Sequence, residues 1–245
     1  GAYRAGTGLV TLATARGVYT IVAAKIIEAT HIPLEETETG GIGSQAIAPV
    51  REALKNCTAL LIGCGLGQEP ETQHFVRELL LENPALADMP LVVDADALNI
   101  IAQDKELLKD VPKDSVLTPH VKEFSRIVGK FDNINDRTAL QVDLSTKYKI
   151  NILVKGHETC MTDSNGDIFI NTTGNPGMAT GGSGDVLTGI ITGLISRGLR
   201  PFDAMIAGAY LHGLSGDIAR ESLGEESMTA QDLVDHLGQS FLKVI

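Results

Sequence analysis

The stretch from residue 171 to residue 197 constrains the fold of this chain more than any other segment. Residues 171–184 are almost all small or turn-forming, and five of them are glycines, at positions 174, 177, 181, 182 and 184. From Asp185 onward, apolar residues recur at helical spacing: Val186, Leu187, Ile190, Ile191, Leu194 and Ile195. The sequence therefore predicts a glycine-dense loop that leads directly into a helix.

Such a loop is suited to binding an anion. The first amides of a helix have no partner within the helix, and the helix dipole adds partial positive charge there. Glycines let the backbone approach an anion closely and aim several N–H groups at it. We therefore expect a phosphate to bind over Ser183, Gly184 and Asp185. The alternative is a glycine-rich turn in which Ser183 or Asp185 simply caps a core helix.

Asp185 is unexpected beside a phosphate site, because a carboxylate repels an anionic ligand. Its position is explained if it takes a proton from a hydroxyl that attacks a phosphorus held by the amides. The loop is not a Walker loop, because no G-K-[ST] follows the glycines. Asp185 is therefore the candidate general base of a phosphoryl transfer.

The segment at residues 175–189, N-P-G-M-A-T-G-G-S-G-D-V-L-T-G, closely resembles the signature of the nucleotide-dependent NAD(P)H-hydrate dehydratases, a branch of the ribokinase-like superfamily. G-x-G-D alone indicates the superfamily, whereas N-P-G-M-A-T-G is more specific. Five further segments resemble family motifs in the family's order. They are G-A-Y-R-A-G-T-G-L-V-T at 1–11, I-G-C-G-L-G at 62–67, V-V-D-A-D-A-L-N at 92–99, T-P-H-V-K-E at 118–123 and K-G-H-E-T at 155–159.

Composition and charge narrow the class of protein. A chain of 245 residues can bury one large core, so we expect a single domain over residues 1–245. The net charge is −11 and the basic residues are scattered, which argues against nucleic acid as a partner. Three cysteines without a C-x-x-C pattern suggest reduced thiols and a cytoplasmic location. The sequence has no apolar run of membrane-spanning length and no recognisable signal peptide, so no membrane partner is expected.

Alternating strand and helix patterns predict an α/β fold: a doubly wound, mostly parallel sheet flanked by helices, which the resemblance identifies as ribokinase-like. Buried strands are expected at 9–13, 59–67, 91–95, from 116, and at 151–156. Helices are expected at 46–56, 71–81, 134–148, 202–223 and 229–242, with Thr229 as an N-cap. Residues 159–163 and 167–171 are expected to form a small β-hairpin with a type I′ turn at Asn165–Gly166. Pro119 ends any regular strand before His120.

The beginning of the chain predicts the end of a helix, stopped by Gly6 or Gly8, before the strand at 9–13. Residues 30–48 predict a loop, because they contain Pro33, an acidic run and three glycines. In the family the opening segment is preceded by a strand and a glycine-rich turn. We therefore expect the domain to be N-terminally incomplete, with its first strand missing from this chain. The sheet would then have an edge strand whose backbone groups are unpaired.

The resemblance assigns roles to individual residues. It implies that Asp185 is the catalytic base, that the amides of Gly182, Ser183 and Gly184 form an anion hole, and that Gly184 also contacts the nucleotide. The remaining nucleotide contacts would be Lys155, Gly156, His157, Glu158 and Thr159. The hydrated dinucleotide would contact Gly65, His120, Asn175 and Asp185. His120-x-x-Glu123 has the spacing of the superfamily's N-x-x-E motif, which implies that Glu123 acts on magnesium through a water.

Each assignment has a structural alternative. Gly65 could serve only the strand-to-helix turn, and Lys155 could be a surface lysine. Asp94 follows a predicted strand, where open α/β sheets bind ligands, but it could equally cap the next helix. Cys64, where the family usually has proline, is expected to be a small filler, since no base accompanies it in the sequence. His212 lies on an apolar helix face and is expected to be a core histidine.

The resemblance implies a repair activity. ADP, in preference to ATP, would phosphorylate the ring hydroxyl of hydrated NADH or NADPH with Mg²⁺, and loss of phosphate would restore NAD(P)H. It further implies a homo-oligomer, a tetramer in the family, and a fused or cooperating NAD(P)H-hydrate epimerase. Two alternatives stay open: a small-molecule kinase of the superfamily that leaves the phosphate on an alcohol, and a nucleotide-binding module without chemistry, against which Asp185 argues.

Overall fold

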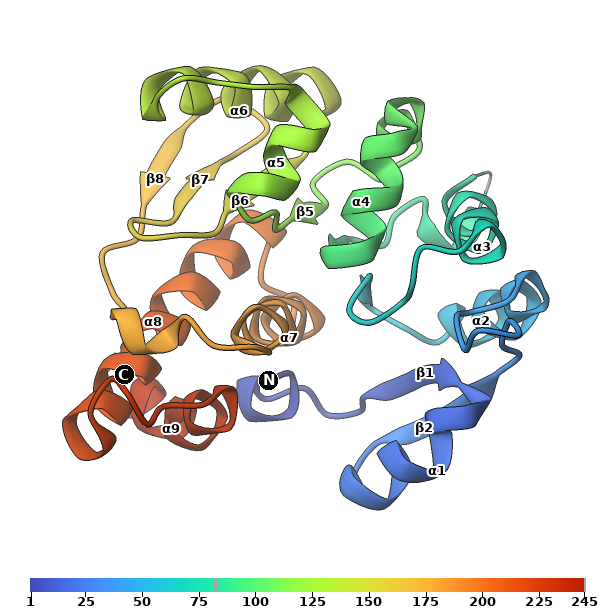
Figure 1. The fold of residues 1–245 in the computed structure, drawn as a ribbon, viewed down its shortest axis with the longest axis horizontal. Helices are drawn as coiled ribbons and strands as arrows, with labels where there is room; N and C mark the ends of the chain where they lie inside the picture. Colours follow the sequence, from blue (N-terminus) through green and yellow to red (C-terminus); the bar gives the residue numbers. More distant parts are fainter. Residues whose placement is uncertain (82, 245) are drawn as a thin grey trace.

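A six-stranded sheet with strand order β3-β4-β5-β6-β7-β8 forms the centre of the computed structural model, which describes residues 1–81 and 83–244 (Figure 1). Four strands run parallel: β3 (Leu60–Ile62), β4 (Leu91–Val93), β5 (Val116–Leu117) and β6 (Asn151–Val154). Then β7 (Cys160–Thr162) and β8 (Ile168–Ile170) continue the sheet antiparallel. The predicted mostly parallel sheet with a terminal hairpin is confirmed, although each strand is shorter than expected.

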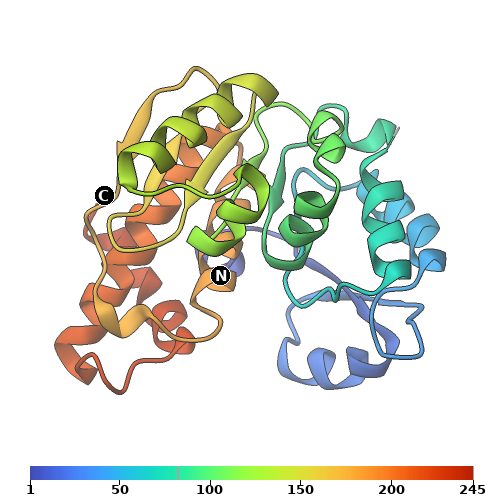
Figure 2. The same cartoon turned by 45° about the horizontal axis from the view of Figure 1, so that its top comes forward.

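Helices cover both faces of this sheet, as Figures 1 and 2 show. The first face carries α2 (Ile47–Leu54), α3 (Pro70–Leu80), α4 (Ala95–Gln103), α5 (Val121–Val128) and α6 (Ile134–Tyr148). The second carries α7 (Ser183–Ser196), α8 (Pro201–Leu223) and α9 (Ala230–Leu242). Because side chains alternate along a strand, Val93 packs into the first core and its neighbour Val92 into the second. Both are buried, so the doubly wound arrangement is confirmed.

The first forty residues differ most from the sequence prediction. Here β1 (Thr11–Ala15) and β2 (Thr30–Leu34) pair in parallel as a separate two-stranded sheet, joined by α1 (Arg16–Lys25). The expected buried strand at 9–13 is wrong in position and burial, since Leu9 is 84% exposed. The expected loop at 30–48 contains β2, which Pro33 had argued against. Proline is tolerated there because β2 is an edge strand with a partner on one side only.

The hairpin turn is longer than the predicted type I′ turn. Thr162 and Ile168 are the last paired residues, and the amide of Gly166 donates to the carbonyl of Asp163 at 3.1 Å. Of the two expected turn residues, Gly166 has a positive φ of 96° and Asn165 does not. The carboxylate of Asp163 organises this turn, accepting hydrogen bonds from the amides of Asn165 and Asp167. Burial would raise the pKa of Asp163, but these hydrogen bonds outweigh it and lower the pKa.

Other expectations at the ends of the elements are confirmed. Gly6 closes the first 3₁₀ helix in the left-handed conformation, and Thr229 is the N-cap of α9, with its amide and hydroxyl donating to Asp232. The 3₁₀ helices are Tyr3–Ala5, Ser44–Ala46, Pro84–Leu86, Lys105–Lys109 and Pro176–Met178. Among the helices that the structure describes, none is long and apolar enough to cross a membrane.

Candidate active site

The carboxyl ends of the four parallel strands bring the candidate residues to one edge of the sheet. The turn after β3 carries Cys64 and Gly65, Asp94 directly follows β4, β5 leads to His120, and Lys155 directly follows β6. His120 and Lys155 are themselves paired across a parallel bridge. Ligands of open α/β sheets bind at this edge. Residues from four separate sequence segments thus lie along one edge of the sheet.

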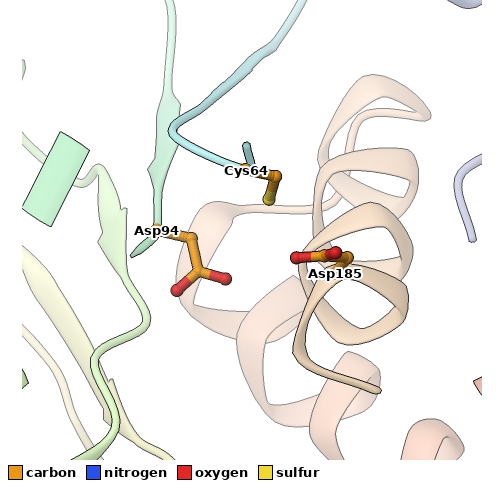
Figure 3. Close-up of side chains that lie close together, drawn as sticks. All are labelled: Cys64, Asp94 and Asp185. Atoms are coloured by element: carbon orange, nitrogen blue, oxygen red, sulfur yellow. The ribbon is translucent and has the colours of Figure 1, made fainter. Parts of the chain in front are cut away.

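Asp185 reaches the same edge of the sheet from helix α7, whereas the residues above follow the strands. It lies in the first turn of α7, and its carboxylate is exposed to solvent. Figure 3 shows the carboxylates of Asp94 and Asp185 and the sulfur of Cys64 converging from three separate elements. One ligand atom of each lies within 4.8 Å of the others. The candidate base therefore faces the strand ends, as the proposed chemistry requires.

A buried ion pair fixes the lysine of this edge. The Nζ of Lys155 lies 2.6 Å from Oδ1 of Asp94, a residue that is 1% exposed. Asp94 occupies the N-cap position of α4, but its carboxylate is directed to the lysine rather than to the helix amides. A Cβ built on Gly184 would lie 3.3 Å from the same Nζ. The ammonium of Lys155 therefore lies over the first turn of α7, beside the predicted anion hole.

The β3 turn must approach Asp94 very closely. Gly63 has a φ of 127°, and a Cβ at this position would lie 1.8 Å from the carbonyl oxygen of Asp94, so only glycine fits. Ala95 next to Asp94 has a left-handed φ of 47°, an uncommon conformation for alanine. The amide of Gly67 donates to Asp96 at 3.0 Å, which holds the end of the turn. Strain and close contact thus concentrate around Asp94.

Cys64 is a protonated thiol at neutral pH. Burial raises its pKa to about 12, and the nearby carboxylates of Asp185 and Asp94 add to the effect. Its sulfur lies 3.9 Å from the hydroxyl of Thr188. A thiol is nucleophilic only as the thiolate, so Cys64 is a poor nucleophile in this state, in agreement with the sequence interpretation.

His120 and Glu123 form a capping box at the start of α5. Nδ1 of His120 accepts from the amides of Lys122 and Glu123, both at 3.1 Å. Glu123 is buried; its Oε2 accepts from the amide of His120 at 2.8 Å, and its Oε1 lies 3.5 Å from Nε2 of His120. The T-P-H-x-x-E spacing therefore has a structural explanation in addition to the functional one. The predicted magnesium role of Glu123 stays a prediction, and both of its oxygens already face His120.

The glycine loop before α7 is tied to α8. Asp217 accepts from the amide of Gly174 at 2.9 Å and from the side-chain amide of Asn175 at 3.0 Å. The side-chain oxygen of Asn175 accepts from the amide of Gly177 at 3.1 Å. Thr173 adds a bond from its hydroxyl to the carbonyl of Tyr210 at 3.0 Å. Asn175, predicted to contact substrate, thus has both ends of its side chain engaged in shaping the loop.

His212 of α8 holds the beginning of α7. Its Nε2 lies 3.0 Å from the carbonyl oxygen of Ser183 and 3.3 Å from the hydroxyl of the same residue. Burial lowers the pKa of His212 to about 4, against a smaller raising effect of the bond to Ser183. The imidazole is therefore neutral, and because a carbonyl only accepts, Nε2 carries its proton. The expected core histidine is indeed buried, but it also positions the predicted anion hole.

The helix start offers unpartnered amides. Gly182 is the N-cap residue, with a left-handed φ of 88°, so the alternative in which Ser183 or Asp185 caps the helix is wrong. The amide of Ser183 makes a long bond of 3.3 Å to the carbonyl of Thr180. Within residues 1–81 and 83–244, the amides of Gly184 and Asp185 donate to no backbone oxygen. An anion would find two open donors there, with the ammonium of Lys155 beside them.

The predicted nucleotide segment is much less constrained. Gly156, His157 and Glu158 are exposed, and Glu158 has a left-handed φ of 54°. The hydroxyl of Thr159 donates to the carbonyl of Gly156 at 3.0 Å and closes the segment on itself. The segment therefore presents its backbone to solvent close to Lys155.

Sequence reasoning missed the residues that hold the site together. Asp94 was left open between a cap and a ligand, His212 was assigned to the core, and Asp217 was not singled out. The D-A-D-A-L-N segment after a strand was the available signal for Asp94. For Asp217 the signal was the one acid in the otherwise uncharged stretch from residue 204 to residue 219.

Comparison with known proteins identifies the family of this chain. A sequence profile of the NAD(P)H-hydrate dehydratase family matches residues 1–239. A bifunctional NAD(P)H-hydrate repair enzyme of Moorella thermoacetica is 43% identical over 240 residues, which cover 96% of this chain and 44% of that protein. An ADP-dependent (S)-NAD(P)H-hydrate dehydratase of Neisseria meningitidis is 38% identical over 174 residues, 69% of this chain and 58% of that protein. The chain spans less than half the length of the bifunctional relative.

Solved structures show the same fold. The ADP/ATP-dependent NAD(P)H-hydrate dehydratase of Bacillus subtilis, co-crystallised with ATP and Mg²⁺ and soaked with CoA, superimposes with a TM-score of 0.76 at 26% identity. That similarity covers 100% of this chain and 84% of the other. A ribokinase-like superfamily protein of Enterococcus faecalis gives a TM-score of 0.81 at 28% identity, over 99% of this chain and 79% of the other.

Proposed function

The chain belongs to the NAD(P)H-hydrate dehydratase family, and on this premise we propose that it restores hydrated NADH and NADPH to NAD(P)H at the expense of ADP or ATP. The observation that carries the proposal is the position of Asp185. Its carboxylate faces Asp94 across the strand ends, beside open helix amides and the ammonium of Lys155. This is the arrangement that a phosphoryl transfer to a hydroxyl needs.

In the proposed first step the terminal phosphoryl group of the nucleotide lies against the amides of Gly184 and Asp185. The ammonium of Lys155 offsets charge that spreads over the phosphoryl oxygens, and Asp94 keeps that ammonium in place. The carboxylate of Asp185 accepts the proton of the ring hydroxyl as its oxygen bonds to phosphorus. AMP leaves when the donor is ADP, and ADP leaves when it is ATP.

In the second step the ring nitrogen expels the phosphate. Its lone pair forms a double bond to carbon 6 as the carbon–oxygen bond breaks, and loss of a proton from carbon 5 restores the reduced nicotinamide. The phosphate leaves in the anion hole at Gly182, Ser183 and Gly184, close to Lys155. The neutral His212 keeps this helix start in position through the carbonyl of Ser183.

The remaining assignments extend along the same edge. We assign Gly65, His120, Asn175 and Asp185 to the hydrated dinucleotide. We assign residues 155–159, together with Gly184, to the nucleotide. The geometry of Gly65 supports a contact with the hydrated dinucleotide, because the space beside its backbone is open and its φ is 63°. Asn175 would act on the substrate by shaping the loop, since its side-chain amide is already bonded.

Magnesium fits the oxygen-rich side of this site. Oxygen donors suit Mg²⁺, which is usually held by one or two carboxylates plus substrate phosphates. Among the residues that the structure describes, Oδ2 of Asp94 accepts no hydrogen bond and is the protein oxygen best placed to hold the ion. The bound ion would offset phosphate charge. Glu123 would act only through a water, because its own oxygens face His120.

We further propose ADP as the preferred donor, a cytoplasmic location where the NAD(P) pool is, and a homo-oligomer, a tetramer by analogy with the family. An epimerase would act on the same hydrates, as a fused domain or a separate protein. The exposed apolar side chains of edge strand β8 support self-association: Ile168, Phe169 and Ile170. Light scattering of the purified chain measures the oligomeric state directly.

The deciding experiment follows the reduced-nicotinamide absorbance after hydrated NADH, Mg²⁺ and either ADP or ATP are added. We expect recovery of NADH with one phosphate and one AMP released per molecule when ADP is the donor. A stable phosphorylated alcohol without NADH would establish the kinase alternative instead. A kcat/KM that favours ATP by about tenfold, equivalent to roughly 1.4 kcal/mol, would overturn the preference for ADP.

A further inference from the structure

The thiol of Cys64 adds a sulfur ligand to this edge of the sheet, and Mg²⁺ does not bind sulfur. Sulfur is a ligand for zinc and other thiophilic ions, whereas magnesium binds oxygen. Cys64 is accessible to solvent, which leaves it open to an ion.

We propose that Cys64, Asp94 and Asp185 form a binding site for a thiophilic divalent cation, Zn²⁺ above all, and that its occupation blocks Asp185. The inhibitory part rests on the proposed role of Asp185, whereas the binding part does not.

The geometry supports a three-ligand site. Sulfur and carboxylate oxygens from β3, β4 and α7 converge within 4.8 Å of one another (Figure 3). In a tetrahedral zinc site with bonds of about 2.0 Å to oxygen and 2.3 Å to sulfur, ligand atoms lie about 3.3–3.5 Å apart. Side-chain rotation of exposed Asp185 and accessible Cys64 can supply that contraction. The fourth position would be left to water.

Asp94 supplies an independent indication of a ligand. It is 1% exposed, and only its Oδ1 is paired, to Lys155. Its Oδ2 accepts no hydrogen bond within the described part of the chain, and a carboxylate oxygen of Asp94 lies within 4.8 Å of the ligand atoms of Cys64 and Asp185. A carboxylate on a residue this deeply buried rarely keeps a free oxygen unless a cation, a ligand or a water meets it.

The charges balance when zinc binds. Asp94 and Asp185 contribute two negative charges and Lys155 one positive charge, so the site is formally −1. Zinc brings +2 and displaces the proton of the Cys64 thiol, which leaves a thiolate of −1. The occupied site is therefore neutral, and one proton is released to the solvent for each ion bound.

The test is titration of the full chain with Co²⁺, without nucleotide and with excess Mg²⁺. Cobalt bound to a thiolate shows a charge-transfer absorption that oxygen ligands do not give. We expect one such site per chain, absent in Cys64→Ala and Cys64→Ser and retained in the matched control Cys57→Ala. Asp94→Asn and Asp185→Asn should weaken the affinity by about tenfold or more, since each removes a charged ligand.

Calorimetry with Zn²⁺ in two buffers of different ionisation enthalpy should show one proton released by the wild-type chain and none by Cys64→Ser. Zinc should suppress turnover of the wild-type chain and leave the rate of Cys64→Ala unchanged relative to its own zinc-free rate. Absence of the thiolate band in the wild-type chain, or its persistence in Cys64→Ala, would overturn the site. Full turnover with zinc bound through Cys64 would overturn the inhibitory part alone.

Discussion

The two segments that enclose the proposed phosphate site are held in different ways. The loop at residues 173–185 is fastened to α8 by Asp217, by the carbonyl of Tyr210 and by His212. The segment at residues 155–159 is anchored at Lys155, whereas its other residues are exposed and closed mainly by the hydroxyl of Thr159.

This difference indicates how the work is divided. Donors that stabilise a transition state act best when they are fixed before the reaction, because no reorganisation is then needed. The loop before α7 meets that requirement through its bonds to α8, one of them to the buried His212. A segment with few buried contacts opens easily and adapts to its ligand. We infer that phosphorus is positioned by the loop, while the nucleotide is accommodated by residues 156–159.

Of the variants considered, Asp185→Asn should have the largest effect on turnover, because it changes the fixed segment at the proposed base. The change keeps the size of the side chain and removes the base, so kcat should fall by about 10²- to 10⁴-fold. Nucleotide binding should persist or tighten slightly, because a charge that repels phosphate is lost. Turnover and nucleotide affinity measured on the same preparation check this. A variant that keeps more than about half of the wild-type kcat would show that Asp185 is not the base.

Asp94→Asn, measured at saturating Mg²⁺ because Asp94 is also the proposed Mg²⁺ ligand, tests whether the ion pair positions the lysine. Loss of one fixed donor typically costs 10²- to 10³-fold, and Lys155 keeps its charge, so we expect kcat to fall by about 10- to 100-fold. The matched Lys155→Met should unfold at lower denaturant concentration than Asp94→Asn, since it leaves a buried carboxylate unpaired. In the double variant the losses should not add. Additive losses would mean that the two residues act independently.

The sequence predicted the elements that depend on hydrophobic periodicity. It did not predict the strands and side-chain roles that depend on contacts with distant parts of the chain. Helix 134–148 agrees with α6 because its pattern and caps are local. The β1–β2 unit was missed because its pairing, not its burial, stabilises it. The position of Asp185 in the first turn of a helix could be predicted from the glycine-rich loop before it. His212 and Asp217 could not be assigned, since their roles depend on which loop α8 meets.

The pH dependence of the unfolding free energy tests how His212 holds the loop before α7. Its folded pKa of about 4 lies below the ordinary 6.5. The unfolded chain therefore binds the proton more readily, and stability falls as pH drops from 6.5 towards 4, by roughly 3 kcal/mol at most. His212→Gln keeps a donor near Nε2 without titrating, so its unfolding free energy should depend less on pH in this window. Equal pH dependence in both chains, by urea unfolding, would contradict the assignment.

His120→Asn separates the substrate role from the capping role. Asparagine is a good N-cap, so α5 should keep its stability while the imidazole is lost. Loss of one contact is worth about 1 kcal/mol, so the KM for the hydrate should rise by about fivefold. The KM for the nucleotide should change little. A matched rise in both values would place His120 elsewhere in the reaction.

The smallest effect on turnover and KM is expected for changes in the segment at residues 155–159. Thr159→Ala removes the bond to the carbonyl of Gly156, and one exposed hydrogen bond is worth about 1 kcal/mol or less. The nucleotide KM should rise by a few-fold at most, on the order of 1 kcal/mol, with kcat unchanged. Thr173→Ala is the matched control, because its hydroxyl holds the rigid loop to α8 through Tyr210. That variant should lower kcat and spare the nucleotide KM, because the loop positions phosphorus rather than adenosine. If Thr159→Ala lowers kcat as much as Thr173→Ala does, the two segments do not divide the work, and the nucleotide segment is as fixed as the loop.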